Sequence, residues 1–176
     1  MRRALALGAV LVLLAGAAAP GAQGSTFDRT LVIVGGKVIL ASDVELARQL
    51  KLVAAADDSD AAILAALENR VLVLAEVSRA LPPEPSSDEL AARRRQWEQS
   101  LGPGVDVAAR LAAAHMSEPA LRAWLLDDLR IQKYEDQRFG RQADPAAARA
   151  AWIADLRHRA GLPAAPPQPL KNTSRI

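Results

Sequence analysis

The feature that most constrains the fold is a pair of short apolar segments joined by two glycines. Residues 31–34 (LVIV) and 38–40 (VIL) are rich in β-branched side chains, and Gly35-Gly36 lies between them. Consecutive glycines readily adopt the positive φ angles that a two-residue hairpin turn requires. Because this combination is a strong local signal for paired strands, we expect an antiparallel β-hairpin here.

The hairpin sequence also predicts what must surround it. Both apolar runs are continuous rather than alternating, which is typical of strands that are buried on both faces. An isolated hairpin is only marginally stable in water, so helices from the rest of the chain are expected to cover it. Ser42 and Glu45 have the spacing of a capping box, which predicts a first helix over residues 42–53.

The rest of the sequence favours helices, because alanine and leucine are abundant and aromatic residues make up only 3% of the chain. Cap residues and helix-stopping glycines or prolines delimit five further helices, over residues 61–81, 86–101, 106–115, 117–139 and 144–161. The second helix has apolar residues around most of its circumference and should be the most buried. The predicted fold is mainly α, a compact bundle of about six helices with a short N-terminal β-hairpin.

The first 24 residues predict a signal peptide. Arg2 and Arg3 precede an apolar run over residues 4–19, and small residues follow it, so we expect cleavage near Ala22 or Gly24. A retained membrane anchor is the alternative, but the run is shorter than the roughly 20 strongly apolar residues of a typical span. The chain has no cysteine, which excludes disulfides and a lipidated cysteine. We therefore expect export to a bacterial periplasm, without stable membrane insertion after cleavage.

Composition divides the rest of the chain into a body and a tail. Residues 25–161 form the predicted helical domain, and residues 162–176 are proline-rich and contain no aromatic side chain. Such a composition predicts a disordered or polyproline-II tail.

The charge balance argues against a nucleic-acid partner. Removing Arg2 and Arg3 from the 22 lysines and arginines leaves 20, which equals the 20 acidic residues. The basic cluster at residues 93–95 lies within a predicted helix beside Glu89 and Glu98, so we interpret it as a solvated helix face.

The sequence contains no recognisable catalytic or metal-binding arrangement. His115 and His158 each lack a second ligand at helical spacing, and the acidic run at residues 57–60 lacks the spacing of a calcium loop. Asp127 and Asp128 are adjacent on a helix and should point apart. We therefore predict a protein that is not an enzyme, with no cofactor and no metal ion.

Several segments together resemble a known family. The segments are DRTLVIVGGKVILASDVEL (28–46), ALENRVLVLAEVSRAL (66–81), SSDELAARRRQWEQSLG (86–102) and HMSEPALRAWLLDDLRIQKYEDQRF (115–139). Over residues 27–139 of this chain, the order of these segments resembles that in the N-terminal domain of SurA and related periplasmic chaperones. The resemblance implies a holdase that acts without ATP on unfolded outer-membrane or secreted proteins. The last helix directly follows the long one, so no room remains between them for the family's parvulin prolyl-isomerase domain.

Three functional hypotheses follow. The favoured one is a SurA-like periplasmic chaperone that lacks the isomerase domain and binds unfolded or partly folded envelope proteins. The alternative is a non-catalytic scaffold or accessory subunit of a cell-envelope complex, and the least supported is a residual prolyl isomerase. Adaptable apolar side chains would contact clients, and the candidates are Trp97, Met116, Trp124 and Tyr134. Core packing is the alternative role for each of them.

Overall fold

The computed structural model describes residues 28–164 and confirms a mainly helical fold with a short N-terminal hairpin. The elements are β1 (Thr30–Val34), β2 (Lys37–Leu40), α1 (Ala41–Gln49), α2 (Asp60–Ala80), α3 (Ser87–Leu101), α4 (Val107–Ala113), α5 (Glu118–Phe139) and α6 (Pro145–Arg159). The predicted signal peptide and residues 165–176 of the predicted tail lie outside the described residues.

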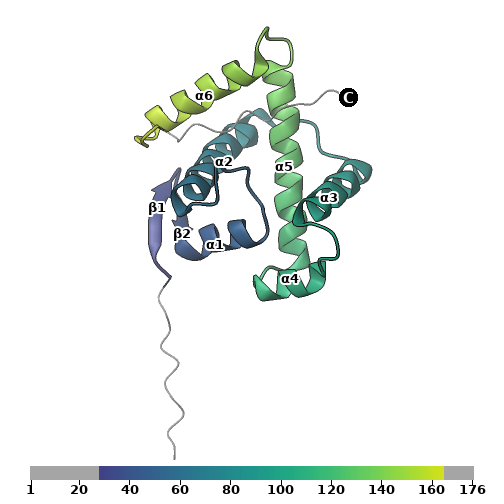
Figure 1. Cartoon of the computed structure of the whole chain (residues 1–176). Helices are drawn as coiled ribbons and strands as arrows, with labels where there is room; N and C mark the ends of the chain where they lie inside the picture. The colour runs from purple at the N-terminus through teal and green to yellow at the C-terminus, as the bar shows by residue number, and fades with distance from the viewer. Residues whose placement is uncertain (1–27, 165–176) are drawn as a thin grey trace, which may run out of the picture.

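Helix α5 occupies the centre of the molecule (Figure 1). It packs against α2, α3 and α6, whereas the hairpin packs against α1 and α2. In Figure 1 the hairpin and α3 lie on opposite sides of α5, and α6 turns back from its upper end toward α2. Because α2 contacts the hairpin as well as α5 and α6, it lies between the hairpin and the C-terminal helices.

The hairpin forms as predicted. Gly35 and Gly36 have φ angles of 54° and 78°, and the strands pair antiparallel with Val34 opposite Lys37 and Ile33 opposite Val38. The pairing is irregular between Thr30 and Val32, so the strand has a bulge near its start.

Only one face of the hairpin is covered, and the prediction that both faces are buried is wrong for residues 28–164. Val34 and Ile39 are buried in the core, but Ile33 is 65% exposed and Val38 50% exposed. The reason is that α1 and α2 approach the ribbon from a single side. Neighbouring residues of a strand point to opposite faces, so the other apolar side chains face outward.

The start of α1 also differs from the prediction. The helix begins at Ala41, and the Leu40 N–H donates to Asp43 Oδ2 at 2.8 Å. The Ser42 hydroxyl instead donates to the Asp28 side chain, so Ser42 and Glu45 do not form the predicted capping box. The helix also ends sooner than predicted, at Gln49.

The remaining helix starts agree closely with the sequence. Ser86 and Glu89 form a capping box at the start of α3, with the Ser86 N–H donating to Glu89 at 2.7 Å. Ser117 caps α5 and Asp144 caps α6. Helix α2 begins one residue before the predicted start at residue 61, and its cap is Ser59, whose hydroxyl accepts from the Ala62 N–H.

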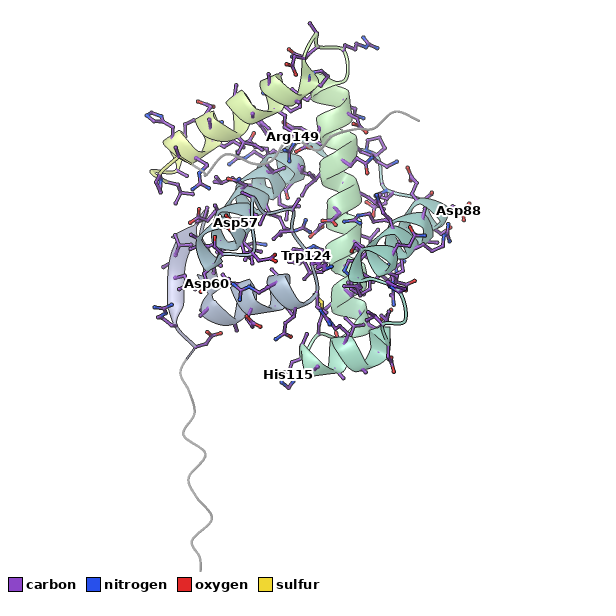
Figure 2. The ribbon with its side chains drawn as sticks, in the orientation of Figure 1. Asp57, Asp60, Asp88, His115, Trp124 and Arg149 are labelled. Carbon is purple, nitrogen blue, oxygen red and sulfur yellow. The ribbon has the colours of Figure 1, made fainter. Side chains whose placement is uncertain are left out.

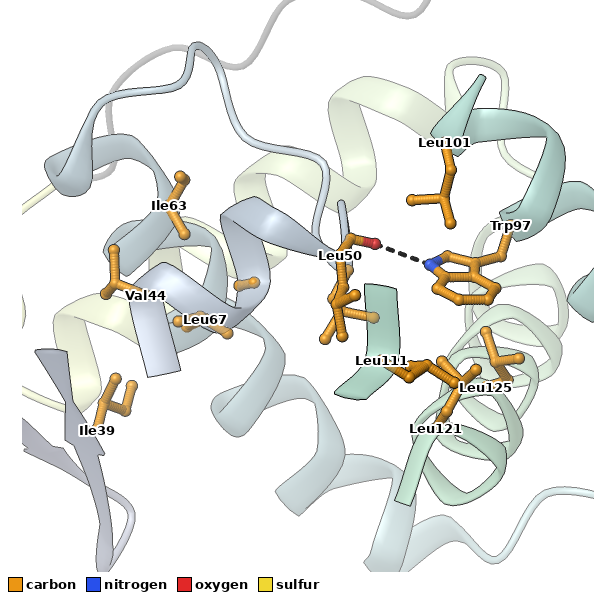
Figure 3. Close-up of a cluster of buried hydrophobic side chains, with 12 residues drawn as sticks. Ile39, Val44, Leu50, Ile63, Leu67, Trp97, Leu101, Leu111, Leu121 and Leu125 are labelled. Carbon is orange, nitrogen blue, oxygen red and sulfur yellow. Dashed lines mark hydrogen bonds between the residues drawn. The ribbon is translucent and has the colours of Figure 1, made fainter. Parts of the chain in front are cut away.

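The core consists of two apolar clusters. The first lies between the hairpin, α1 and the lower part of α5, and includes Leu50, Trp97, Leu121 and Leu125 (Figure 3). The second lies beneath α6, and its buried residues are Val34, Leu72, Val73, Val77, Tyr134, Phe139, Trp152, Ile153 and Leu156. Helix α2 supplies residues to both clusters. The extensive burial of α2 confirms the prediction that it is the most buried helix.

A buried polar network attaches α6 to α2. The Arg157 side chain is only 2% exposed, and its guanidinium donates to Glu68 Oε2 and Asn69 Oδ1, both at 2.8 Å. Arg157 Nε also donates to the Pro163 carbonyl at 2.7 Å. The half-buried Leu162 packs against the second cluster, so the folded body continues into the first residues after α6.

We predict that Arg157→Ala lowers the free energy of unfolding by about 3–5 kcal/mol, because it leaves the Glu68 carboxylate buried without its partner. Urea denaturation measures the change. The matched control is Arg159→Ala on the same helix, which removes an exposed pair with Asp155 and should change stability by less than about 1 kcal/mol. Equal effects of the two substitutions would contradict the proposed importance of the network.

Candidate functional site

Trp97, the first predicted client-binding residue, is a core residue. It is 2% exposed, and its indole Nε1 donates to the Leu50 carbonyl at 2.8 Å (Figure 3). The indole is surrounded by residues of the first apolar cluster. Trp97 therefore has a structural role, since it joins α3 to the end of α1.

Trp124 is held in a polar cluster between α2, α3 and α5. The Arg70 guanidinium lies 3.9 Å from the centre of the Trp124 ring, and the indole Nε1 donates to the Leu52 carbonyl at 3.3 Å. Arg70 also forms an ion pair with Asp128, and Arg93 forms a second ion pair with the same carboxylate at 2.6 Å. The Arg70 guanidinium, which is held by Asp128, therefore covers one face of the Trp124 ring.

Tyr134 and Met116 also pack within the molecule. Tyr134 is buried in the second cluster, with its ring centre 5.7 Å from that of Trp152. Met116 is half-buried against the first cluster. The structure therefore does not bring Trp97, Met116, Trp124 and Tyr134 together on one exposed surface, and core packing accounts for the placement of these side chains.

The polar residues considered for chemistry are dispersed. His115 lies after α4, whereas Asp57 and Asp60 lie at the start of α2 and just before it (Figure 2). Residues 28–164 contain no group of three or more His, Cys, Asp or Glu side chains that could hold a metal ion. Asp127 and Asp128 bind different arginines, as expected for side chains that point apart.

The basic cluster at residues 93–95 is largely engaged in ion pairs. Arg93 pairs with Asp128, and Arg94 pairs with Glu98 at 2.7 Å and with Glu118. Only Arg95 of the three is exposed. Two of the three cations therefore hold α3 against α5 or stabilise α3 itself.

A shallow polar groove of about 440 Å³ lies between α3 and α5. Its lining mixes charged, amide and apolar side chains, and consists of Glu89, Ala92, Arg93, Gln96, Leu129, Gln132, Lys133 and Asp136. Lys133 pairs with Glu89 across the groove at 2.8 Å. Because the opposite charges pair with each other, the groove has no strong preference for one sign of ligand charge.

The candidate binding surface is instead the outer face of the hairpin. Ile33 and Val38 are directly opposite each other in the ribbon, and both are exposed. Leu81, at the end of α2, is the other large apolar side chain among residues 28–164 that is mainly exposed. The sequence alone does not single out this pair, because continuous apolar runs do not show which strand face the helices leave open.

We predict that Glu89 makes stability depend on pH. Hydrogen bonds from the Lys133 ammonium and from the Ser86 N–H lower the pKa of Glu89 from 4.5 to about 2. Because the folded-state pKa is the lower one, ionised Glu89 stabilises the fold above pH 4.5, and this contribution is lost as the pH falls toward 2. Urea unfolding of Glu89→Gln should show a smaller loss of stability than the wild-type protein between about pH 7 and pH 3.

Glu98→Gln, on the same helix, controls for the removal of any one carboxylate. An unchanged pH dependence in Glu89→Gln would contradict the assigned role of Glu89.

Comparisons with protein-family models, characterised proteins and solved structures found no match for this chain. The resemblance to the SurA N-terminal domain therefore remains a proposal. Between residues 28 and 164, no helix combines the length and the apolar character that a membrane crossing requires.

Proposed function

We propose that this protein is a periplasmic, ATP-independent chaperone that binds unfolded or partly folded envelope proteins. The observation that carries the proposal is the exposed Ile33–Val38 pair on the outer face of the hairpin. Two neighbouring aliphatic side chains on a short, well-formed ribbon are a suitable contact for the apolar segments that an unfolded chain exposes.

The arrangement of elements supports the same proposal. The hairpin, the buried α2, the capped α3 and the long α5 follow the order of segments on which the resemblance to SurA rests. Helix α6 packs back on α2 and α5 directly after the turn that follows Phe139. Binding through such a body requires no arranged catalytic groups, because a holdase lowers the concentration of free, aggregation-prone chains.

The predicted signal peptide also supports the proposal. The basic and apolar residues at the N-terminus have the pattern of a signal peptide, and the chain contains no cysteine. A periplasmic holdase would work where ATP is absent, so binding must depend on exposed surface alone.

We predict that protein lacking residues 1–24 slows the aggregation of an outer-membrane β-barrel protein diluted from urea, without ATP. Light scattering measures the rate, which should fall with increasing chaperone concentration. An inert folded protein of similar mass, at the same concentration, is the control for crowding. No suppression at several-fold molar excess would contradict the proposal.

Crosslinking in the cell separates this function from the alternative of a scaffold. A holdase should capture many different exported proteins during their transit, and capture should increase when outer-membrane assembly is impaired. A single folded partner in stoichiometric amount would instead indicate an accessory subunit of an envelope complex.

A further inference from the structure

Helix α6 can leave the molecule without disturbing the first apolar cluster. It is the last helix of the described chain, and the exposed residues 140–144 join it to α5. Figure 1 shows it at the edge of the molecule, where it packs against α2 and α5. Among residues 28–164, the first cluster takes no member from α6. An element on which the rest of the core does not depend can open as a separate unit.

The inner side of α6 docks through a small set of side chains. Trp152, Ile153 and Leu156 are buried in the second cluster, and Arg157 is buried beside them. The outer side of the helix consists mainly of exposed alanines. Three apolar side chains and one cation therefore make up most of the buried contact of α6.

The surface beneath α6, here called the α6-docking surface, is apolar and partly aromatic. Its buried apolar members come from β1, α2 and α5, and are Val34, Leu72, Val73, Val77, Tyr134 and Phe139. The ring centres of Tyr134 and Phe139 lie 5.7 Å and 5.4 Å from that of Trp152. When α6 is released, these side chains form an exposed apolar patch of the kind that binds other proteins.

The same surface contains acceptors for an arginine. Glu68 and Asn69 are each 6% exposed, and their side-chain oxygens accept from the Arg157 guanidinium at 2.8 Å. A planar guanidinium donates to both acceptors at once, whereas an ammonium group acts as a point charge. Among residues 28–164, no other basic side chain pairs with Glu68. The surface therefore selects a segment that carries an arginine next to its apolar residues.

We infer that α6 is a displaceable occupant of the α6-docking surface, and that a client segment of the same chemistry takes its place. This inference rests on the proposed holdase function and adds a second site to the exposed hairpin face. The client segment is an amphipathic helix with aromatic and aliphatic residues followed by arginine, as in Trp152, Ile153, Leu156 and Arg157. Docked α6 covers a large apolar surface while no client is present, which protects the chaperone itself from association.

The buried ion pair is compatible with release of α6. Release returns the Arg157 and Glu68 charges to water, whereas a substitution at Arg157 leaves the carboxylate without its partner while α6 is docked. The docking free energy therefore comes mainly from the apolar side chains. The tether favours α6 over a free segment, because linked groups have a high effective concentration. A client segment binds only the molecules in which α6 is released, so loosening α6 raises the apparent affinity.

We predict that a labelled peptide with the sequence of residues 145–162 binds more tightly when the protein's own α6 is loosened. Fluorescence anisotropy measures its affinity for protein lacking residues 1–24. Arg157→Ala in the protein should raise the affinity by about tenfold or more, because it weakens the competing helix and keeps Glu68 and Asn69 in place. A peptide with alanine in place of the arginine that corresponds to Arg157 should lose this gain.

Control variants separate displacement from a general loss of structure. Arg159→Ala changes an exposed arginine of the same helix and should leave peptide affinity unchanged. Circular dichroism and urea unfolding establish that each variant is folded. If Arg157→Ala is not folded, Arg157→Lys replaces it, since it keeps the charge but not the planar fork and should raise the affinity to a smaller extent. Equal peptide affinity of wild-type protein and the folded variant at position 157 would overturn the inference.

Hydrogen exchange reports the release of α6 directly. In wild-type protein, the α6 amides should open with a lower free energy than the amides of Trp97 and Leu125, which belong to the first cluster. Arg157→Ala should speed exchange in α6 more than at Trp97 and Leu125. Identical opening free energies for α6 and the first cluster in wild-type protein would mean that α6 leaves only on global unfolding, which contradicts the inference.

A cross-link tests whether release is required for binding. Arg149 of α6 pairs with Glu135 of α5 at 2.7 Å, and the chain has no cysteine of its own. Glu135→Cys and Arg149→Cys can therefore be joined selectively by a short bis-maleimide, which holds α6 on α5. In Arg157→Ala protein that carries both cysteines, joining should remove most of the gain in peptide affinity. The same protein without the reagent is the control, and equal affinity of the two forms would exclude displacement.

Further outcomes identify a different occupant or separate the two proposals. A dimer of Arg157→Ala in which α6 docks onto the other copy would assign the surface to a second copy and overturn the client assignment. If peptide affinity does not respond to loosening of α6 but wild-type protein suppresses aggregation, this site is wrong and the holdase function stands. If peptide affinity rises as predicted but the protein does not suppress aggregation, displacement of α6 is supported and the holdase function fails.

Discussion

The fold depends on the burial of α2, because this helix is apolar around most of its circumference. Such a helix is stable in water only when other elements cover it on several sides. The hairpin and α1 cover one part, α5 a second and α6 a third. The first core cluster takes its α2 residues from the N-terminal half of the helix and the second from the C-terminal half, so the elements before and after α2 in the chain meet along it.

Buried polar residues on α2 determine where α6 packs against it. Glu68 and Asn69 are buried with the apolar residues and would be costly without partners. Arg157 supplies those partners, so the network favours one position of α6 over others that would bury similar apolar area. A buried charged pair of this kind selects a geometry more clearly than it adds stability, and this is the role that we assign to it here.

The residues that we propose for binding are not those with the largest apolar side chains. The three tryptophans and the tyrosine have partners inside the molecule, either carbonyl oxygens, aromatic rings or a fixed guanidinium. The exposed Ile33 and Val38 side chains come instead from the ribbon face that the described helices leave uncovered, because α1 and α2 pack against its other face. The proposed function therefore depends on a surface that the core does not need.

The sequence by itself determined the local structure. The paired glycines specify the turn, and Ser86, Ser117 and Asp144 specify helix starts, because these effects act over a few neighbouring residues. Only the tertiary structure decided that Ser42 binds Asp28 instead of capping α1, that Trp97 is buried, and that Ile33 and Val38 face outward. Each of these outcomes depends on which distant segment lies opposite, and spacing along the chain does not contain that information.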